Sequence, residues 1–402
     1  VAQKLFHKYR SEEYRKEYKK HLAKLKPGEL PSLPDPDKVK IRVYATQSTH
    51  KTLSSFRQGS MIQIWDEEFS RRVADNFQEA YMTHTTTSAN YQILASLDVG
   101  RRQVELEGYE LVEKSIEMAM ILRSKIQDHP KLSKYFHVLT VKDLIPQEFR
   151  KHGSNEYYTS ENGWDRMEES WEKDEFVLDP TKVTLSVGKT GIVGDVFKNE
   201  YLMNRFNIQV NKTSRNTVLF MTNIGTTRGS VTFLINALFQ IAEELDESNR
   251  SLNKREAEIS KKHIQSLIQD VPPLPDFSTF HRSFLAAPGV PGGNIREAFF
   301  LAYDEELCEY IILADCLTEL KKGKELVSTS FVIPYPPGFP ILVPGQIVSE
   351  EILRFMIALD VKEIHGYRAD LGLKVFTKEA LNRKNTISAM GAIPMMSNKA
   401  KK

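Results

Sequence analysis

Residues 38–51 read KVKIRVYATQSTHK, and this stretch decides the fold class. Its first half alternates basic and apolar residues, which is typical of a strand with one buried face. The apolar positions are Val39, Ile41 and Val43. A second strand is predicted over 61–65, and between Arg101 and Gln127 the apolar residues recur with the helical period of about 3.6. Strands that alternate with a long amphipathic helix predict an α/β layer.

Farther along the chain, residues 131–255 have the pattern of a small α+β domain. The predicted strands are VTLSV (183–187), FNIQV (206–210) and TVLFMTNIG (217–225). Helices are predicted over 195–205 and 231–245. A strand, helix, strand, strand order of this kind suits a sheet covered by helices.

The two ends of the chain have a different character. Residues 1–37 combine a charged helical segment with the Pro-rich connector PGELPSLPDPD (27–37). Residues 256–402 carry a helical stretch near 295–320, a proline-dense loop at 334–344 and a helix over 349–359. The predicted domains are therefore 1–37, 38–130, 131–255 and 256–402.

Composition excludes several classes of protein. The 402 residues include 55 Lys and Arg against 53 Asp and Glu, so the net charge of +2 is no footprint for nucleic acid. Tyrosines within the basic segment 1–26 leave nucleic-acid contact open there, but a solvated helix is favoured. Cys308 and Cys316 are too few for a disulfide framework or a Cys-rich metal site, so we expect no metal and a cytoplasmic setting. No apolar run reaches the roughly 18 residues of a membrane span.

The chemistry concentrates in residues 45–51, just after the first predicted strand, where α/β folds place ligands. Lys51 is suited to a Schiff base with an aldehyde cofactor. Ser48 and Thr49 offer short hydroxyls for a phosphate, and His50 can relay a proton. By spacing alone, a polar turn explains the same residues.

Several longer segments resemble one family. They run in the same order as in that family, from about residue 44 to 376. These segments are YATQSTHKTLSSFRQGSMIQIW, NFQEAYMTHTTTSANYQILASLDVGRRQVELEG, LDPTKVTLSVG, NKTSRNTVLFMTNIGTTRG, STSFVIPYPPGFPILVPGQIVSEE and EIHGYRADLGLKVF. The chain thus resembles the bacterial ornithine/lysine/arginine decarboxylases, pyridoxal-phosphate enzymes of the aspartate-aminotransferase fold. The resemblance implies the C-terminal part of a transferase-like large domain, then a small α+β domain and an α+β C-terminal domain.

The same resemblance implies roles for individual residues. Lys51 is the Schiff-base lysine, Ser48 binds the phosphate of pyridoxal 5'-phosphate, and His50 contacts the bound substrate and helps to protonate it. Thr86 and Ser88 match a loop that reaches the site of a neighbouring subunit, so an oligomer, at least a dimer, is expected. His84 begins that loop, and a packing role for it is at least as well supported as a catalytic one.

Two departures from the family shape the expected function. The family carries an upstream half with an aspartate on the pyridine nitrogen and a residue stacked on the ring. The 50 residues before Lys51 have no counterpart of this half, so we expect another chain to supply it. Asn211 stands where lysine and ornithine enzymes tend to have an acidic residue, which favours arginine slightly as the basic amino acid to be decarboxylated. The alternative is a non-catalytic scaffold or regulatory subunit that keeps the fold.

Overall fold

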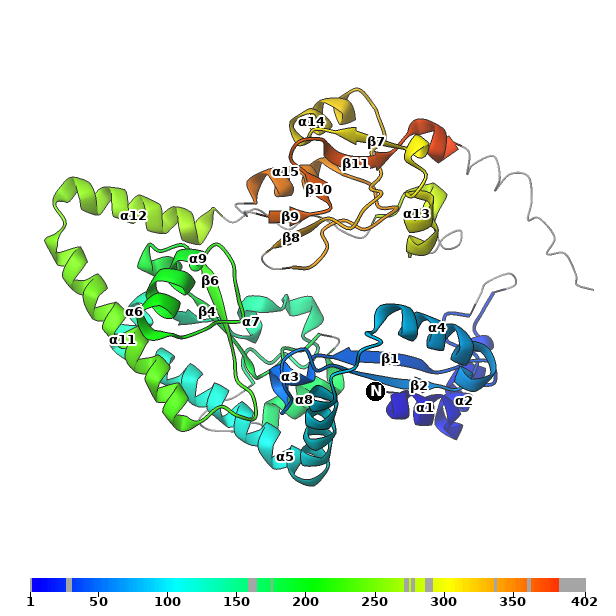
Figure 1. The fold of residues 1–402 in the computed structure, drawn as a ribbon, viewed down its shortest axis with the longest axis horizontal. Coiled ribbons are helices and arrows are strands. Elements are labelled where there is room, and N and C mark those ends of the chain that lie inside the picture. The colour runs from blue at the N-terminus through cyan, green and yellow to red at the C-terminus, as the bar shows by residue number, and fades with distance from the viewer. Residues whose placement is uncertain are drawn as a thin grey trace, which may run out of the picture. The chain divides into compact units, whose positions relative to one another are not determined.

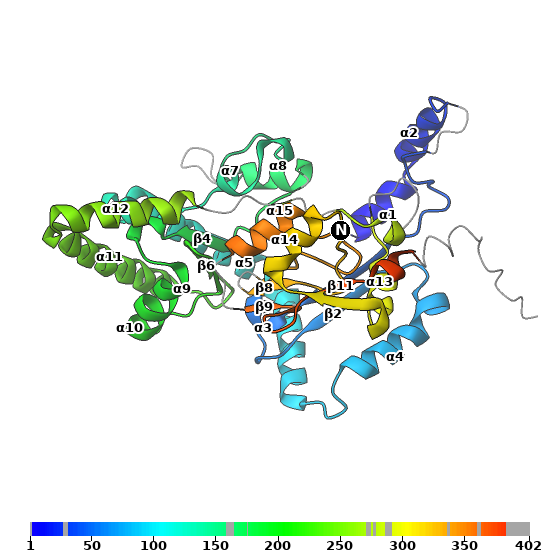
Figure 2. The same cartoon turned by 90° about the horizontal axis from the view of Figure 1, so that it is seen from above.

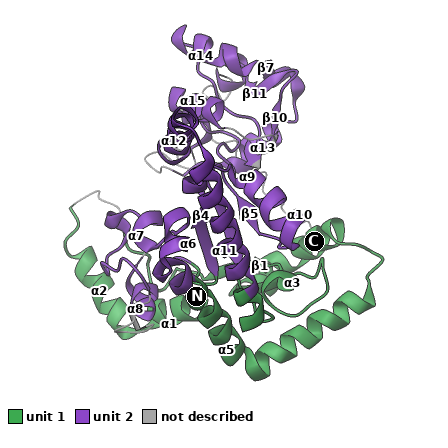
Figure 3. Ribbon diagram, turned by 90° about the vertical axis from the view of Figure 1, so that its left-hand side faces the viewer, with its two compact units in different colours: residues 1–122, 179–181, 222–232 green, residues 123–178, 182–221, 233–402 purple. Residues whose placement is uncertain are grey.

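The computed structural model describes residues 2–26, 31–157, 165–174, 176–270, 275, 279–285, 292–335, 338–359 and 363–382. It divides into two compact units (Figure 3). The first unit comprises residues 1–122, 179–181 and 222–232, and the second comprises 123–178, 182–221 and 233–402. Parts of the predicted linker 27–37, Trp164 and the C-terminal tail lie outside the described residues.

The charged N-terminal segment is helical, as predicted. It forms α1 (Ala2–Arg10) and α2 (Glu12–Leu22). Ser11 separates them because its hydroxyl accepts a hydrogen bond from the amide of Tyr14 at 3.1 Å, which starts α2 as an N-cap. Arg10 then fixes α1 to the chain ahead of the first strand, donating to the carbonyls of Pro36 and Val39 at 2.9 and 3.1 Å.

The two strands of the first unit form an antiparallel pair, β1 (Arg42–Gln47) and β2 (Met61–Asp66). Both were predicted, but β1 begins later than the alternation at 38–45 suggested. The reason is a contact with a distant residue: the amide of Ile41 donates to the Glu67 carboxylate at 2.7 Å instead of joining a strand ladder. Figure 1 shows α3 (Thr49–Thr52) at the end of β1 from which the chain leaves the sheet.

A long helix dominates the rest of the first unit. After a π-helical turn η1 (Phe69–Val73) and α4 (Ala74–His84), α5 runs over Tyr91–Asp128. It starts ten residues before the predicted helix because the Asn90 side chain accepts the amides of Gln92 and Ile93. It ends at the predicted place, since Pro130 opens the next helix, α6 (Pro130–Tyr135). The division into units falls within α5, after Leu122.

The second unit contains a four-stranded antiparallel sheet of order β3-β4-β6-β5. The strands are β3 (His137–Val138), β4 (Lys182–Ser186), β5 (Lys212–Thr213) and β6 (Thr217–Met221). The strand predicted over 206–210 is wrong. Asn207 adopts a left-handed φ of 53°. Its amide donates to the Met203 carbonyl and the Ile208 amide donates to the Leu202 carbonyl, so these two amides close a helix instead of joining a sheet.

Helices and helical turns of the second unit precede and follow these strands. They are α7 (Val141–Leu144), η2 (Gln147–Phe149), α8 (Asp165–Lys173), η3 (Gly188–Thr190), α9 (Gly194–Val196), η4 (Phe197–Met203), α10 (Asn204–Phe206), α11 (Arg228–Ser251), whose residues 228–232 belong to the first unit, and α12 (Lys254–Gln269). The polar stretch after residue 250 is thus a helix, and Asn253 and Glu256 form its capping box. Figures 1 and 2 show that the chain turns back between α11 and α12. The amide of the Asn216 side chain donates to the Leu267 carbonyl at 2.9 Å, which ties α12 to the turn before β6.

The last part of the chain forms two small sheets, β8-β9 and β10-β11-β7. Its elements are η5 (Arg282–Phe284), α13 (Ile295–Leu301), η6 (Glu305–Leu307), β7 (Cys308–Ile311), α14 (Leu313–Lys321), β8 (Ile333–Tyr335), α15 (Glu350–Ala358), β9 (Glu363–His365), β10 (Tyr367–Arg368) and β11 (Gly372–Phe376). The helix predicted over 349–359 is confirmed. The stretch near 295–320 is two helices instead of one, because β7 lies between them and pairs with β11. The predicted domain bounds stay predictions.

Candidate functional site

Lys51 and Ser48 lie on the short helix α3, directly after β1, and both side chains are exposed. Ser48 occupies the N-cap position, yet its hydroxyl makes no capping hydrogen bond. The Lys51 amine forms no hydrogen bond or ion pair with any residue in the described part of the chain. An amine and a hydroxyl three residues apart on one turn are therefore both available to a ligand.

Thr49 sits between them and is buried, with only 1% of its surface exposed. Its hydroxyl has no hydrogen-bond partner in the structure. A buried unpaired hydroxyl is costly, so such groups usually mark a site that another group completes. The donor set fits an aldehyde-bearing phosphate: an exposed primary amine for the aldehyde and neighbouring hydroxyls for the phosphate.

His50 is held by a single backbone carbonyl. Its Nδ1 lies 2.9 Å from the carbonyl oxygen of Gly59, and the same oxygen accepts the His50 amide at 3.4 Å. The loop that carries Gly59 rests on α5: the Ser54 hydroxyl donates to Gln103 at 2.6 Å and the Phe56 amide to the Ser96 hydroxyl at 3.0 Å. The imidazole is therefore oriented by a loop that the long helix supports.

Backbone contacts hold the other side of α3. The Asn223 side chain donates to the Lys51 carbonyl, and the Ile224 amide donates to the Thr52 carbonyl, both at 3.4 Å. Residues 222–232 belong to the first unit with Lys51. The segment NIG of the predicted strand 217–225 is thus a loop that supports the lysine, because β6 ends at Met221.

The loop that contains Thr86 and Ser88 follows α4 and is exposed. Its hydrogen bonds are local: the Ser88 amide donates to the Thr86 hydroxyl at 3.1 Å. In the described part of the chain, no hydrogen bond joins His84, Thr86 or Ser88 to residues 48–51. Their predicted role at a neighbouring subunit's site stays a prediction.

Asn211 belongs to the second unit, where it is exposed just before β5. Its amide donates to the Leu219 carbonyl at 2.9 Å, which fixes the start of the β5–β6 hairpin. The Thr213 hydroxyl, buried on the same short strand, donates to Asp195 at 2.5 Å. The side chain of Asn211 is thus presented by a hairpin whose backbone is firmly held.

A cluster of charges lies at the end of the β1–β2 pair. Glu68, which is nearly buried, accepts hydrogen bonds from Arg42 and Arg71, and Arg72 lies 3.4 Å away. The bond from Arg42, followed by that from Arg71, holds the pKa of the Glu68 carboxyl below its usual range. Tyr44 donates to Asp66 in the same cluster at 2.7 Å. These ionic contacts fix the strand that leads to Lys51.

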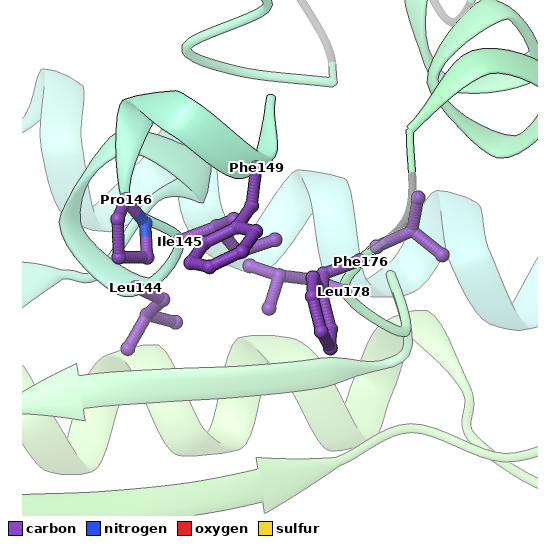
Figure 4. Close-up of a pocket in the computed structure, with 7 residues that line it drawn as sticks. Leu144, Ile145, Pro146, Phe149, Phe176 and Leu178 are labelled. Atoms are coloured by element: carbon purple, nitrogen blue, oxygen red, sulfur yellow. The ribbon is translucent and has the colours of Figure 1, made fainter. Parts of the chain in front are cut away.

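An apolar pocket of about 350 Å³ lies in the second unit (Figure 4). It is lined by Leu144, Ile145, Pro146, Phe149, Phe176, Val177 and Leu178. None of these side chains can transfer a proton or pair with a charge, and none is a predicted site residue. Among the described residues, no group of His, Cys, Asp or Glu is arranged to hold a metal ion, and no helix is long and apolar enough to cross a bilayer.

Sequence reasoning missed the residues that support His50. Gly59, Ser54 and Gln103 act through contacts between segments far apart in sequence, which no local pattern reveals. Gly100 lies inside α5, where glycine is unfavourable unless packing requires it, but the predicted helix began only at Arg101.

Comparison with known proteins supplies the family. Residues 16–230, more than half of the chain, match the model of the ornithine/lysine/arginine decarboxylase major domain. The inducible lysine decarboxylase of Escherichia coli K12 is 27% identical over 362 residues, which cover 82% of this chain and 47% of that protein. The arginine decarboxylase of Bacillus subtilis is 26% identical over 313 residues, covering 78% of this chain and 49% of that protein.

Solved structures share the fold. The lysine decarboxylase of Francisella novicida has a TM-score of 0.55 at 23% identity, over 86% of this chain and 50% of that one. Lysine decarboxylase A of Pseudomonas aeruginosa gives a TM-score of 0.52 at 19% identity, over 84% and 49%. The chain spans about half the length of the curated relatives it matches. From the matched major domain, the chain belongs to the ornithine/lysine/arginine decarboxylase family.

Proposed function

We propose that this chain carries the cofactor-binding lysine of a pyridoxal-phosphate-dependent decarboxylase that acts on a basic amino acid. The observation that supports the proposal most directly is the Lys51 amine, which is exposed and unpaired among the described residues and lies within the family match. When bound, the cofactor supplies an electron-withdrawing ring that stabilises the charge left on Cα after CO2 departs.

The residues of the chain then have distinct tasks. The Lys51 amine holds the aldehyde carbon of the cofactor, and the free Ser48 hydroxyl donates to its phosphate. His50 delivers a proton to the carbon that has lost CO2, which requires a fixed imidazole within reach of that carbon. Its bond to the Gly59 carbonyl provides the fixed orientation.

Arginine is the proposed substrate, ahead of lysine and ornithine. Asn211 carries no charge, so it can hydrogen-bond to a guanidinium but cannot pair with a compact distal ammonium as a carboxylate would. Rates of decarboxylation of the three amino acids test this proposal. Asn211→Glu should move the preference toward lysine and ornithine, while Asn207→Asp, on the preceding turn, should not.

We also propose an oligomer, at least a dimer, in which Thr86 and Ser88 contact the cofactor of a neighbouring subunit. Thr86→Ala together with Ser88→Ala should weaken cofactor binding, whereas Thr83→Ala in the last turn of α4 should not. The predicted N-terminal chain stays a prediction, which identification of the polypeptides that co-purify with this chain will test. A cytoplasmic location is part of the same proposal.

The central experiment asks where the cofactor attaches. The chain, with any polypeptide that co-purifies, is mixed with pyridoxal 5'-phosphate, reduced with borohydride and digested, and the modified peptide is identified by mass spectrometry. We expect one modified lysine, Lys51, and none in Lys51→Ala. Lys40→Ala, in the same segment, should be modified like the wild type. An adduct-free Lys51 in a folded protein would favour the alternative, a non-catalytic scaffold or regulatory subunit.

A further inference from the structure

We propose that the loop Ser54–Gly59 sets the proton arrangement of His50, so that Nε2 is its working nitrogen, and that Gly100 and Gln103 on α5 are positioning residues for this purpose. The inference rests on the proposed function for the use made of His50. The arrangement itself follows from contacts within the first unit.

The tautomer follows from the chemistry of the partner. Nδ1 of His50 lies 2.9 Å from the Gly59 carbonyl oxygen, which can only accept a hydrogen bond. Nδ1 must therefore carry a proton, so Nε2 is the nitrogen that exchanges one: a ring protonated on both nitrogens delivers its proton from Nε2, and the neutral ring that remains keeps the lone pair there. No hydrogen bond to Nε2 is formed by any residue in the described part of the chain, so this nitrogen is available to a ligand.

Close packing fixes the position of the Gly59 carbonyl. Gly100 is buried in α5, and a Cβ built on it would lie 2.1 Å from the Ser54 carbonyl oxygen, far inside any contact that real Cβ atoms make. The loop therefore lies against the bare backbone of the helix at this glycine. The Ser54 hydroxyl adds a bond of 2.6 Å to Gln103, one turn along the same helix.

The backbone of the loop transmits this packing to His50. Gln58 adopts a φ of 70°, a left-handed conformation that is uncommon outside glycine, immediately before Gly59. A Cβ on Gly59 would lie 2.7 Å from the Ser55 hydroxyl, so the turn is closed on itself. A methyl group at position 100 must displace Ser54, and this compact turn carries the displacement to the carbonyl that holds Nδ1.

The comparison of two glycines on one helix tests the proposal. Gly100→Ala and Gly108→Ala gain the same helix propensity, but the Cβ at 108 meets only the Val104 side chain, 2.9 Å away, which can rotate. The full chain is prepared with ring-15N histidine, and the His50 signal is assigned by its loss in His50→Gln. The nitrogen shifts report which ring nitrogen carries the proton.

In the wild type and Gly108→Ala we expect the proton on Nδ1. In Gly100→Ala we expect mixed tautomers, with the Nδ1–H form disfavoured by about tenfold, the scale of one weakened hydrogen bond from the imidazole. Gln103→Ala removes the 2.6 Å bond without a clash and should shift the tautomer in the same direction, which keeps the test valid if Gly100→Ala does not fold.

Two results would overturn the proposal: a wild-type His50 protonated on Nε2, or an Nδ1–H signal unchanged in both Gly100→Ala and Gln103→Ala. The tautomer is read without cofactor. A chain that shows the expected tautomer but forms no adduct at Lys51 would therefore refute the proposed function and leave the positioning device standing.

Discussion

The sheet that leads to Lys51 and the sheet of the second unit are held together in different ways. In β4 and β6 every second side chain is buried, including Val183, Leu185, Val218 and Phe220. No residue of β1 or β2 is fully buried. The second sheet is stabilised by an apolar core, whereas the pair β1–β2 depends on polar and ionic contacts at Glu68 and on a loop docked against α5.

This difference shows that the proposed site is not located where the packing of the chain is densest. Lys51, Ser48 and His50 lie on or beside elements whose side chains face outward. Backbone carbonyls, glycines and ion pairs fix their positions instead. Binding residues on a sparsely packed segment are typical of sites that a ligand completes.

The largest effect is expected from the buried core of the second sheet. Leu185→Ala should lower the free energy of unfolding by about 2–5 kcal/mol, because it removes a fully buried side chain and leaves a cavity. Ile64→Ala, on the partly exposed β2, should cost about 1 kcal/mol or less. Urea unfolding of the full chain measures both, and equal losses would remove the contrast between the two sheets.

The ionic cluster should give a smaller loss that depends on pH. Because Arg42 and Arg71 lower the pKa of Glu68, its stabilisation is complete above the ordinary value of 4.5 and is lost as the pH falls through the lowered pKa. Glu68→Gln should therefore lower the melting temperature at pH 7, and its effect should shrink progressively as the pH falls below 4.5. Glu244→Gln, in the exposed pair with Arg205, should have a minor effect throughout this range. A Glu68 variant as stable as the wild type at pH 7 would contradict this account.

The C-terminal region should lose stability at a higher pH than the first unit. His281 is almost fully buried, its Nδ1 accepts the Ser283 amide at 3.2 Å, and Glu325 lies 3.5 Å from Nε2. Burial lowers the pKa of His281 despite Glu325, so the folded form holds the ring neutral. Stability should decline as the pH falls below the ordinary value of 6.5 and continue to decline to the lowered pKa.

His281→Asn tests this expectation, because its amide oxygen can still accept from Ser283 but cannot be protonated. The variant should flatten the fall in melting temperature between pH ~7 and ~5. The exposed His263 provides the control, and its asparagine variant should keep the wild-type slope. If His281→Asn also kept the wild-type slope, another group would be responsible for the acid sensitivity.

The smallest effect is expected at Thr49. Its buried hydroxyl has no partner in the structure, so Thr49→Val should change stability by less than about 1 kcal/mol, while Thr49→Ser, which removes the buried methyl, should cost about 1 kcal/mol. Thermal unfolding without cofactor measures both. A large loss in Thr49→Val would show that the hydroxyl already has a partner, and would weaken the contrast between core and site.

Local patterns predicted most of the helices and strands, but not the long-range contacts that fix their ends and positions. The alternation at 39–43 identified the first strand, yet its start depends on Glu67, 26 residues away. The pattern of FNIQV resembled a strand because periodicity does not register the left-handed turn at Asn207. For the site, Lys51, Ser48 and His50 came from a short motif and a resemblance, whereas Gly100 acts through a contact that no local pattern contains.

Burial differs between the two halves of α5, and this difference should be visible in amide hydrogen exchange. With 38 residues at about 1.5 Å each, the helix is roughly 57 Å long. Its first half is mostly exposed apart from Gly100, and its second half buries Met118, Ala119, Leu122 and Ile126. Amides near Tyr91 should therefore exchange through local fraying, and those beyond Ser115 only through cooperative opening of the core. The exchange rates along one helix would thus report the low local stability near the proposed site and the high stability of the packed core.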